Sequence, residues 1–230
     1  MDYFEHRKNI LHAEGVSLEQ VAARFGTPCY VYSKAIIKDN FHAFDAPFGD
    51  YPHRICYAVK ANGNLAVLQV LRQLGSGYDI VSGGELDRVL AAGGRPENVV
   101  FSGVGKSRLE IERAIIAGVR TISLESNAEL NRVNSIALHL GKRASIAFRI
   151  NPDVDAGTHP YIATGLHENK FGIPSEEALT LFQKAKNMKG VEVTGIGCHI
   201  GSQIHEIEPF CDALERVLDL VDKLKKLGII

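Results

Sequence analysis

Short apolar runs alternate with longer amphipathic segments along most of the chain. Six runs predict buried strands over residues 55–60, 78–82, 98–102, 121–125, 145–151 and 191–200. The segments that follow them predict helices over 65–74, 84–92, 107–117, 128–140, 175–187 and 209–227. Strands and helices that alternate through short glycine-rich links are typical of a parallel sheet covered by helices. The pattern therefore predicts an α/β fold of consecutive βα units.

Residues 1–32 do not follow this alternation. Ser17 precedes a predicted helix in the N-cap position of a capping box, and Gly26 ends that helix. A β-prone run follows at 29–32, and Ser33 is placed to cap the next helix. We therefore expect a separate N-terminal segment, 1–32, ahead of the main domain.

Alternation within the strands distinguishes a barrel from an open sheet. Three strands each have one face of mostly small residues that ends in a large polar one. These faces are Cys56, Ala58 and Lys60; Ser145, Ala147 and Arg149; and Val193, Gly195, Gly197 and His199. This pattern suits a barrel whose inner top layer is a ligand site, whereas strands of an open parallel sheet are apolar on both faces.

The predicted units fill the chain without completing a barrel. A complete (β/α)8 barrel takes about 250 residues and at least about 200. Six βα units already occupy residues 53–227, and the apolar end resembles the start of a seventh strand. We therefore expect residues 33–230 to form an incomplete (β/α)8 TIM-type barrel that belongs to a longer protein.

Composition argues against several classes of partner. The net charge of −1 provides no electrostatic footprint for nucleic acid or an anionic membrane. No run approaches the roughly 20 apolar residues of a membrane span, and the N-terminus lacks an apolar signal core. The four cysteines show no zinc or redox spacing, and the two inside predicted strands, Cys56 and Cys198, are expected to be reduced and buried. We expect a cytoplasmic protein that binds no nucleic acid, membrane or metal.

Three polar residues are expected to meet at the top of the barrel: Lys60, Arg149 and His199. Taken singly, a strand-end lysine is more often a surface residue and a lone histidine more often part of a core. A desolvated lysine, however, loses its charge readily, and its neutral amine forms a Schiff base with an aldehyde. The imidazole ring can stack on an aromatic cofactor, and the turn at Gly201 and Ser202 can bind a phosphate. Together these features indicate pyridoxal 5'-phosphate (PLP).

Three motifs resemble the barrel domain of the PLP-dependent decarboxylases of the alanine-racemase-like fold. They are YAVKAN at 57–62, YDIVSGGEL at 78–86 and HIGSQ at 199–203. Within that group, the stretch RINPDVDAGTHPYIATGLHENKFG at 149–172 resembles the diaminopimelate decarboxylase family. The resemblance extends over nearly all of residues 3–230.

The resemblance implies a role for each matching residue. Lys60 would hold the cofactor covalently and later act in reprotonation, the ring of His199 would stack on the cofactor, and Ser202 would bind its phosphate. Three further polar residues would line the cofactor site: Asp79, Glu85 and Arg149. For Asp79 a structural hydrogen bond, and for Glu85 a helix N-terminal charge, fit the sequence equally well.

The same resemblance implies a substrate and an assembly. The substrate would be the amino acid meso-diaminopimelate, the product L-lysine, and the intact protein a homodimer. Residues 1–32, with a strand near Tyr30, would belong to a β domain that the C-terminal half completes. In that family the glycine-rich phosphate loop and the partner of the ring nitrogen would lie beyond residue 230. We therefore expect residues 1–230 alone to be inactive or nearly so.

Three other functions remain open. A sister decarboxylase for ornithine, arginine or carboxynorspermidine is disfavoured by the stretch 159–172, although the deciding substrate contacts would lie beyond residue 230. A single-domain barrel that binds PLP without turnover fits the length, but the His-Gly-Ser unit lies too close to the end to leave room for two more βα units. A regulatory homologue without activity is disfavoured because Lys60 and His199 are retained.

Overall fold

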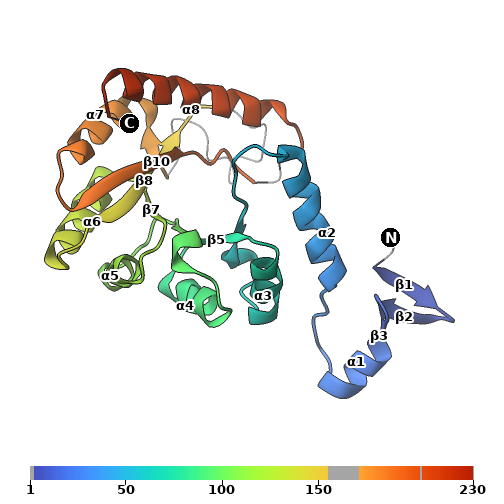
Figure 1. The fold of residues 1–230 in the computed structure, drawn as a ribbon. Coiled ribbons are helices and arrows are strands. Elements are labelled where there is room, and N and C mark those ends of the chain that lie inside the picture. The colour runs from blue at the N-terminus through green and yellow to red at the C-terminus, as the bar shows by residue number, and fades with distance from the viewer. Residues whose placement is uncertain (1–2, 155–170, 203, 230) are drawn as a thin grey trace.

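The computed structural model describes residues 3–154, 171–202 and 204–229. A curved parallel sheet carries helices on its outer side, and a small antiparallel sheet lies apart from it at the N-terminal end (Figure 1). Within these described ranges, no helix is both long enough and apolar enough to cross a membrane.

The N-terminal sheet has three short strands in the order β1-β2-β3. They are β1 (Phe4–Arg7), β2 (Ile10–Ala13) and β3 (Val16–Ser17), and α1 (Leu18–Phe25) follows directly. The predicted capping box is wrong: Ser17 pairs with His12 as the end of β3, and its side chain makes no cap hydrogen bond. Residues 29–32 are not part of a strand in the described part of the chain. The predicted strand near Tyr30 would pair within a β domain that the C-terminal half completes, so it stays a prediction.

Glu14 joins this sheet to helix α2 (Lys34–Asp45). Its carboxylate accepts hydrogen bonds from Ser33 Oγ at 2.7 Å and from the Ala35 amide at 2.9 Å. Ser33 caps α2 as predicted, since its hydroxyl accepts a hydrogen bond from the Ile36 amide. The helix N-terminus, which carries unsatisfied N–H groups, is thus the attachment point for the N-terminal segment.

The parallel sheet has the order β10-β8-β7-β6-β5-β4, and β9 pairs with β8 outside this path. Its strands are β4 (Cys56–Ala58), β5 (Gly77–Ile80), β6 (Val99–Phe101), β7 (Thr121–Leu124), β8 (Ala144–Asn151), β9 (Ile173–Pro174) and β10 (Val191–Gly197). The α-helices that follow are α3 (Leu65–Gln73), α4 (Gly83–Ala91), α5 (Arg108–Ala117), α6 (Asn127–His139), α7 (Ser175–Lys186) and α8 (Glu208–Lys226). Three 3-10 turns are η1 (Ala46–Phe48), η2 (Val59–Ala61) and η3 (Pro96–Asn98).

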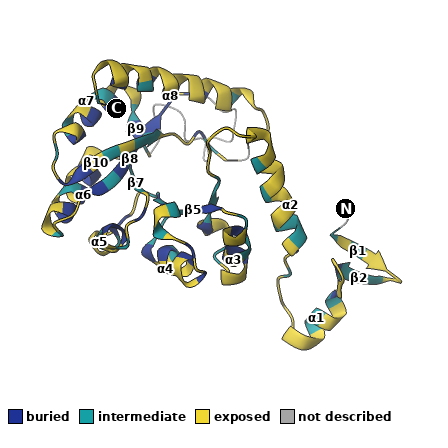
Figure 2. Ribbon diagram, viewed as in Figure 1, coloured by how far each residue is buried: buried dark blue, intermediate teal, exposed yellow. Residues whose placement is uncertain are grey.

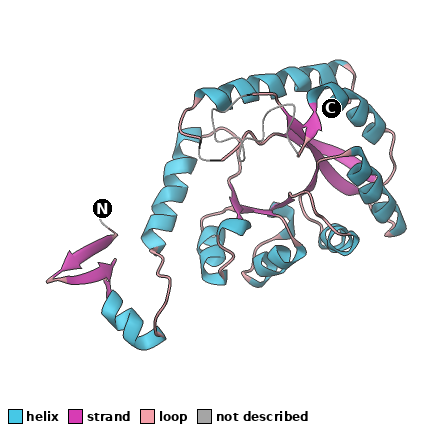
Figure 3. Ribbon diagram, turned by 180° about the vertical axis from the view of Figure 1, so that it is seen from behind, coloured by secondary structure: helices cyan, strands magenta, loops and turns pink. Residues whose placement is uncertain are grey.

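All six predicted βα units are therefore present in the predicted order. The strands follow a curved path, and the helices lie outside them (Figure 3). The two ends of the path, β4 and β10, do not pair with each other among the described residues. The arrangement is the partial barrel that the sequence predicts.

The core lies between the strands and the helices that cover their outer faces (Figure 2). Ile146, Phe148 and Ile150 of β8 are buried in this layer, as the alternation predicts. Phe148 meets Phe182 of α7 with ring centroids 4.7 Å apart and an interplanar angle of 70°. Burying each such side chain contributes about 1.5–3 kcal/mol, so this layer holds the strand ends in place.

A β-bulge in β10 changes one predicted face. Val193 pairs with Ile146 but Gly195 pairs with Ala147, which leaves Thr194 as the extra residue. Val193 therefore packs against the core, while Gly195 turns to the inner side of the sheet. The prediction that Val193 shares the inner face is wrong, because an inserted residue breaks the two-residue alternation.

Gly190 marks a close approach between α6 and the start of β10. A Cβ atom at this position would lie 2.5 Å from the carbonyl oxygen of Asn134 and 2.8 Å from its Oδ1. The Gly190 amide donates a hydrogen bond of 2.9 Å to the same Oδ1. The glycine is therefore needed because backbone and a hydrogen-bonded side chain fill the space around it.

We predict that Gly190→Ala lowers the free energy of unfolding by about 1–3 kcal/mol, because the added methyl group overpacks this contact. Urea denaturation followed by circular dichroism measures the change. Gly105→Ala is the control, since a Cβ atom there meets nothing within 4 Å. Equal losses in the two variants would contradict the prediction.

Candidate functional site

A cavity of about 630 Å³ opens on the inner side of the sheet, at the carboxyl ends of its strands. This volume is in the range of small-molecule sites, and the carboxyl ends of barrel strands are where such sites lie. The charged and imidazole side chains around it are Lys60, Asp79, Glu125, Arg149 and His199. Small residues form much of the rest of the wall, including Gly103, Ala147, Gly195 and Gly197.

Lys60 lies in the turn η2 rather than in a strand. The pairing of β4 with β5 ends at Ala58, opposite Asp79, so the backbone turns before the lysine. The prediction of a strand through Lys60 is therefore wrong by two residues, although the side chain does line the cavity. Lys60 is exposed, so the described residues do not form the desolvated surroundings that we expected for it.

Asp79 lies near the carboxyl end of β5, on the inner face of the sheet. Its Oδ1 accepts a hydrogen bond from the Ser102 hydroxyl, which follows β6. Burial raises the pKa of Asp79, and the Ser102 hydrogen bond and the positive charges of Lys60, Lys106 and Arg149 only partly offset this effect. The structural hydrogen bond that the sequence left open is thus present, and the same carboxylate also faces the cavity.

Arg149 projects from the inner face of β8 toward the end of β7. Its Nη1 donates to Oε1 of Glu125 at 3.1 Å. The Glu125 side chain is 6% exposed and the Arg149 side chain 17% exposed. Glu125 Oε2 and Arg149 Nε are buried without a hydrogen-bond partner in the described structure. The sequence analysis missed Glu125, although a charged residue at the end of a predicted strand is the signal that identified Lys60.

His199 follows β10 and lies on the cavity wall. Partial burial lowers the pKa of its imidazole below 6.5, and the positive charges of Arg149 and Lys60 lower it further. These effects favour the neutral form of the ring. The neighbouring Cys198 is an exposed free thiol on the same wall, contrary to the expectation of a buried one. Burial of its sulfur still raises its pKa.

Two of the six predicted site residues do not line this cavity as it is described. Ser202 is exposed in the loop after His199. Glu85 lies in the first turn of α4, where its Oε2 accepts a hydrogen bond from the Val81 amide at 2.9 Å. The structure thus brings together Lys60, Asp79, Arg149 and His199. Most of the motif at 149–172 falls on residues 155–170, which lie outside the described residues.

A buried lysine that the sequence analysis did not single out supports the cavity. The Lys106 ammonium group donates to the carbonyl oxygens of Gly103 and Ser123 and to Oε1 of Glu129, the last two at 2.6 and 2.8 Å. Glu129 Oε2 in turn accepts a hydrogen bond of 2.8 Å from the Glu125 amide. These contacts fix the backbone after β6 and β7, where Ser102 and Glu125 are found.

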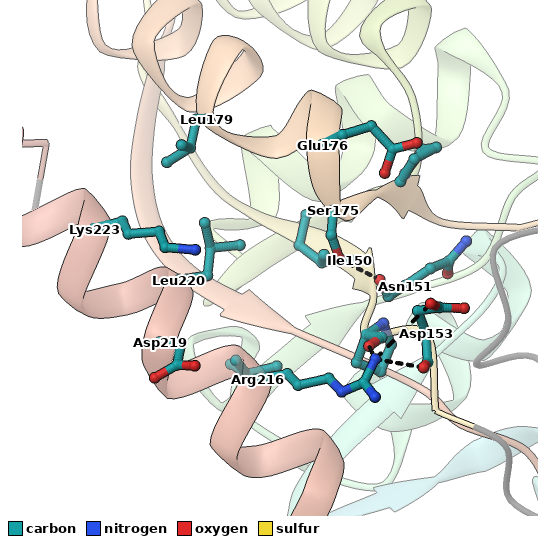
Figure 4. Close-up of a pocket in the computed structure, with 13 residues that line it drawn as sticks. Ile150, Asn151, Asp153, Ser175, Glu176, Leu179, Arg216, Asp219, Leu220 and Lys223 are labelled. Carbon is teal, nitrogen blue, oxygen red and sulfur yellow. Dashed lines mark hydrogen bonds and ion pairs between the residues drawn. The ribbon is translucent and has the colours of Figure 1, made fainter.

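A second cavity, of about 310 Å³, lies between β8, α7 and α8 (Figure 4). Arg216 of α8 donates to the carbonyl oxygens of Pro152 and Asp153 at 2.8 and 2.5 Å. Ser175 Oγ donates to the Asn151 carbonyl at 2.6 Å. These bonds tie both helices to the end of β8. We assign this cavity a structural role, because none of the side chains that converge on the inner cavity contributes to it.

Known proteins with similar sequences identify the family of this chain. A family model described as "Pyridoxal-dependent decarboxylase, pyridoxal binding domain" matches residues 34–230. The chain is 55% identical to the diaminopimelate decarboxylase of Pseudomonas aeruginosa over 229 residues and 54% identical to that of Vibrio cholerae over 230 residues. Each match covers 100% of this chain and 55% of the relative.

A solved structure gives the same result. The crystal structure of diaminopimelate decarboxylase from Helicobacter pylori complexed with L-lysine superposes with a TM-score of 0.89 at 44% identity, and the match covers 92% of this chain and 54% of that one. The chain spans about half the length of the curated relatives that it matches. The chain therefore belongs to the family of pyridoxal-dependent decarboxylases, and its residues 34–230 match their pyridoxal-binding domain.

Proposed function

We propose that the protein containing this chain decarboxylates meso-diaminopimelate to L-lysine and CO2 with PLP as cofactor. The observation that carries the proposal is the meeting of Lys60, Asp79, Arg149 and His199 on one cavity of a pyridoxal-binding domain. The relatives that are 54–55% identical bear the name diaminopimelate decarboxylase. The Helicobacter pylori relative was solved with L-lysine, which is the product of the proposed reaction.

The residues around the cavity fit PLP. The Lys60 amine is exposed and can bond to an aldehyde carbon. Gly197 leaves room for a ring, because a Cβ atom there would meet nothing within 4 Å. Arg149 and Lys60 supply positive charge for an anionic cofactor and for the carboxylates of the substrate. An amine, an arginine and open space beside a glycine thus suit a phosphorylated aldehyde.

Bound PLP supplies an electron sink for the electron pair that remains when CO2 leaves. Lys60 holds the cofactor through Nζ and moves a proton to the product carbon. His199 presents a neutral, flat ring, which adds no further positive charge beside Lys60 and Arg149. Asp79 places a carboxylate near both cations and lowers the net positive charge of the cavity. Arg149 orients an anionic group of the ligand through N–H donors other than the one that bonds Glu125.

Four parts of the proposal rest mainly on the family resemblance. Ser202 is proposed to bind the cofactor phosphate, and Glu85 to line the cofactor site. Residues 1–32 are proposed to belong to a second β domain; the separate antiparallel sheet and the start of the family match at residue 34 support this division. The intact protein is proposed to be a cytoplasmic homodimer.

The first prediction concerns Lys60. Borohydride reduction of the full-length protein with PLP, followed by peptide mapping, is expected to place a stable adduct on Lys60. Lys60→Ala is expected to lose the adduct and to slow CO2 release from meso-diaminopimelate by at least about a hundredfold, because both covalent attachment and proton transfer are lost. Lys142→Ala, at an exposed position outside the cavity, is the control. An adduct on another lysine would contradict the assignment of Lys60 as the residue that binds PLP covalently.

The second prediction concerns the space above Gly197. Gly197→Val is expected to raise the dissociation constant of PLP by about five- to a hundredfold, because overpacking a well-fitted site costs about 1–3 kcal/mol. Absorbance titration with PLP measures the change. The thermal midpoint of the cofactor-free protein is expected to stay close to that of Gly105→Val, whose Cβ atom also meets nothing within 4 Å. Unchanged PLP affinity would contradict this placement of the cofactor.

The third prediction follows from the lowered pKa of His199. As the pH falls below about 6.5, this histidine binds more protons in the unfolded chain than in the folded protein. The free energy of unfolding therefore decreases as the pH falls. The loss levels off once the pH is below the folded-state pKa. His199→Gln lacks this loss. The free energy of unfolding of the variant, relative to that of the wild type, is therefore expected to be higher at pH 5.5 than at pH 7.5. Urea denaturation at both pH values tests this, and a constant difference would contradict it.

A further inference from the structure

The ion pair between Glu125 and Arg149 forms part of the cavity wall and is only partly satisfied. One bond of 3.1 Å joins Arg149 Nη1 to Glu125 Oε1. Arginine has five N–H donors in a planar fork that matches both oxygens of a carboxylate. Here Arg149 Nε and Glu125 Oε2 are both buried without a hydrogen-bond partner in the described ranges. An ion pair that served only stability would engage both atoms in hydrogen bonds, because a buried polar atom without a partner is costly.

Glu125 is the fixed member of the pair. Its backbone amide donates to Oε2 of Glu129, and the other oxygen of Glu129 accepts from the buried Lys106. The Lys106 side chain is 0% exposed and the Glu129 side chain 9% exposed, so this support is held away from water. The backbone of Glu125 is therefore held in place at the carboxyl end of β7, and it fixes the point from which the side chain starts.

Arg149 is the member of the pair whose charge acts on other ionisable groups of the cavity. Its positive charge contributes to the lowered pKa of His199, and it partly offsets the increase that burial causes in the pKa of Asp79 and of Cys198. Its guanidinium carbon also lies 6.0 Å from the centroid of the Phe171 ring. An arginine side chain has many rotamers, so this one direction requires a partner that holds it.

We propose that Glu125 is a positioning residue, which holds the guanidinium group of Arg149 toward the ligand and leaves its remaining N–H donors for an anionic group there. The proposal rests on the proposed function for the identity of the ligand, which is PLP. Glu125 itself acts through Arg149 and leaves the reacting atoms to other residues.

A double-mutant cycle in the full-length protein tests this role. Glu125→Gln keeps the shape of the side chain but removes its charge, and it is expected to raise the dissociation constant of PLP by about tenfold or more, as for other buried charge pairs. Arg149→Met is expected to do at least as much. Because Glu125 acts through Arg149, Glu125→Gln is expected to add less than about twofold in the Arg149→Met background. Independent, multiplying effects of the two substitutions would overturn the proposal.

A second readout needs no cofactor. Among the described residues, the ionisable groups that share the cavity wall with His199 are Lys60, Asp79, Glu125, Arg149 and Cys198. Arg149→Met is expected to raise the pKa of His199, measured by NMR titration of its ring, because a nearby cation is removed. Glu125→Ala is expected to raise it too, because the released guanidinium group turns away. An unchanged or lowered pKa in Glu125→Ala would show that Arg149 keeps its place alone and would overturn the proposal.

Two controls keep the outcomes separate. Glu112→Gln removes the carboxylate of an exposed ion pair with Arg108 on α5 and is expected to leave both readouts at wild-type values. A shift as large as that of Glu125→Gln would mean that the readouts respond to any lost carboxylate, and it would overturn the assignment. A wild-type protein that fails to bind PLP contradicts the proposed function instead, and the NMR titration then still decides whether Glu125 positions Arg149.

Discussion

Parallel hydrogen bonding between neighbouring strands is the constraint on which the site depends. It places the carboxyl ends of β4, β5, β6, β7, β8 and β10 along one edge of the sheet. Residues that follow those ends therefore meet although they are far apart in sequence. Lys60 and His199 reach the same cavity because β4 and β10 lie at the two ends of one curved path. The outer apolar layer keeps this curvature, since Phe148 and its neighbours bind the strands to the helices.

The cavity is also an electrostatic arrangement in which burial and charge oppose each other. Burial raises the pKa of Asp79, and the cations around it partly offset the increase. For His199, burial and the positive charges of Arg149 and Lys60 act together and lower the pKa of the ring. Lys106 carries its charge into the interior because carbonyl oxygens, Glu129 and the Phe101 ring surround it. Buried charges that are held in place in this way set the electrostatic potential of the cavity without a rearrangement of the protein.

The sequence was most informative where a local pattern has a single three-dimensional meaning. Apolar runs and amphipathic segments predicted every βα unit, and motif resemblance predicted the family that the comparison then established. It failed where geometry depends on a neighbour. The N-terminal strands β1 to β3 pair with one another, but they lack the long alternation that would have predicted them. The bulge at Thr194 depends on pairing with β8 and leaves no mark in the composition of β10.

By itself, the sequence determined the order of strands and helices, the partial barrel and the placement of Lys60, Arg149 and His199 at one edge, because these follow from periodicity and from the direction of parallel strands. Only the tertiary structure decided which polar residues contact one another. Glu125 and Lys106 became visible through contacts across β6, β7, α6 and β8, and the hydrogen bond from the Val81 amide to Glu85 became visible in the same way. The physical reason is that hydrogen bonds and ion pairs depend on distances of a few ångströms between separate elements, and side-chain patterns along one strand do not contain those distances.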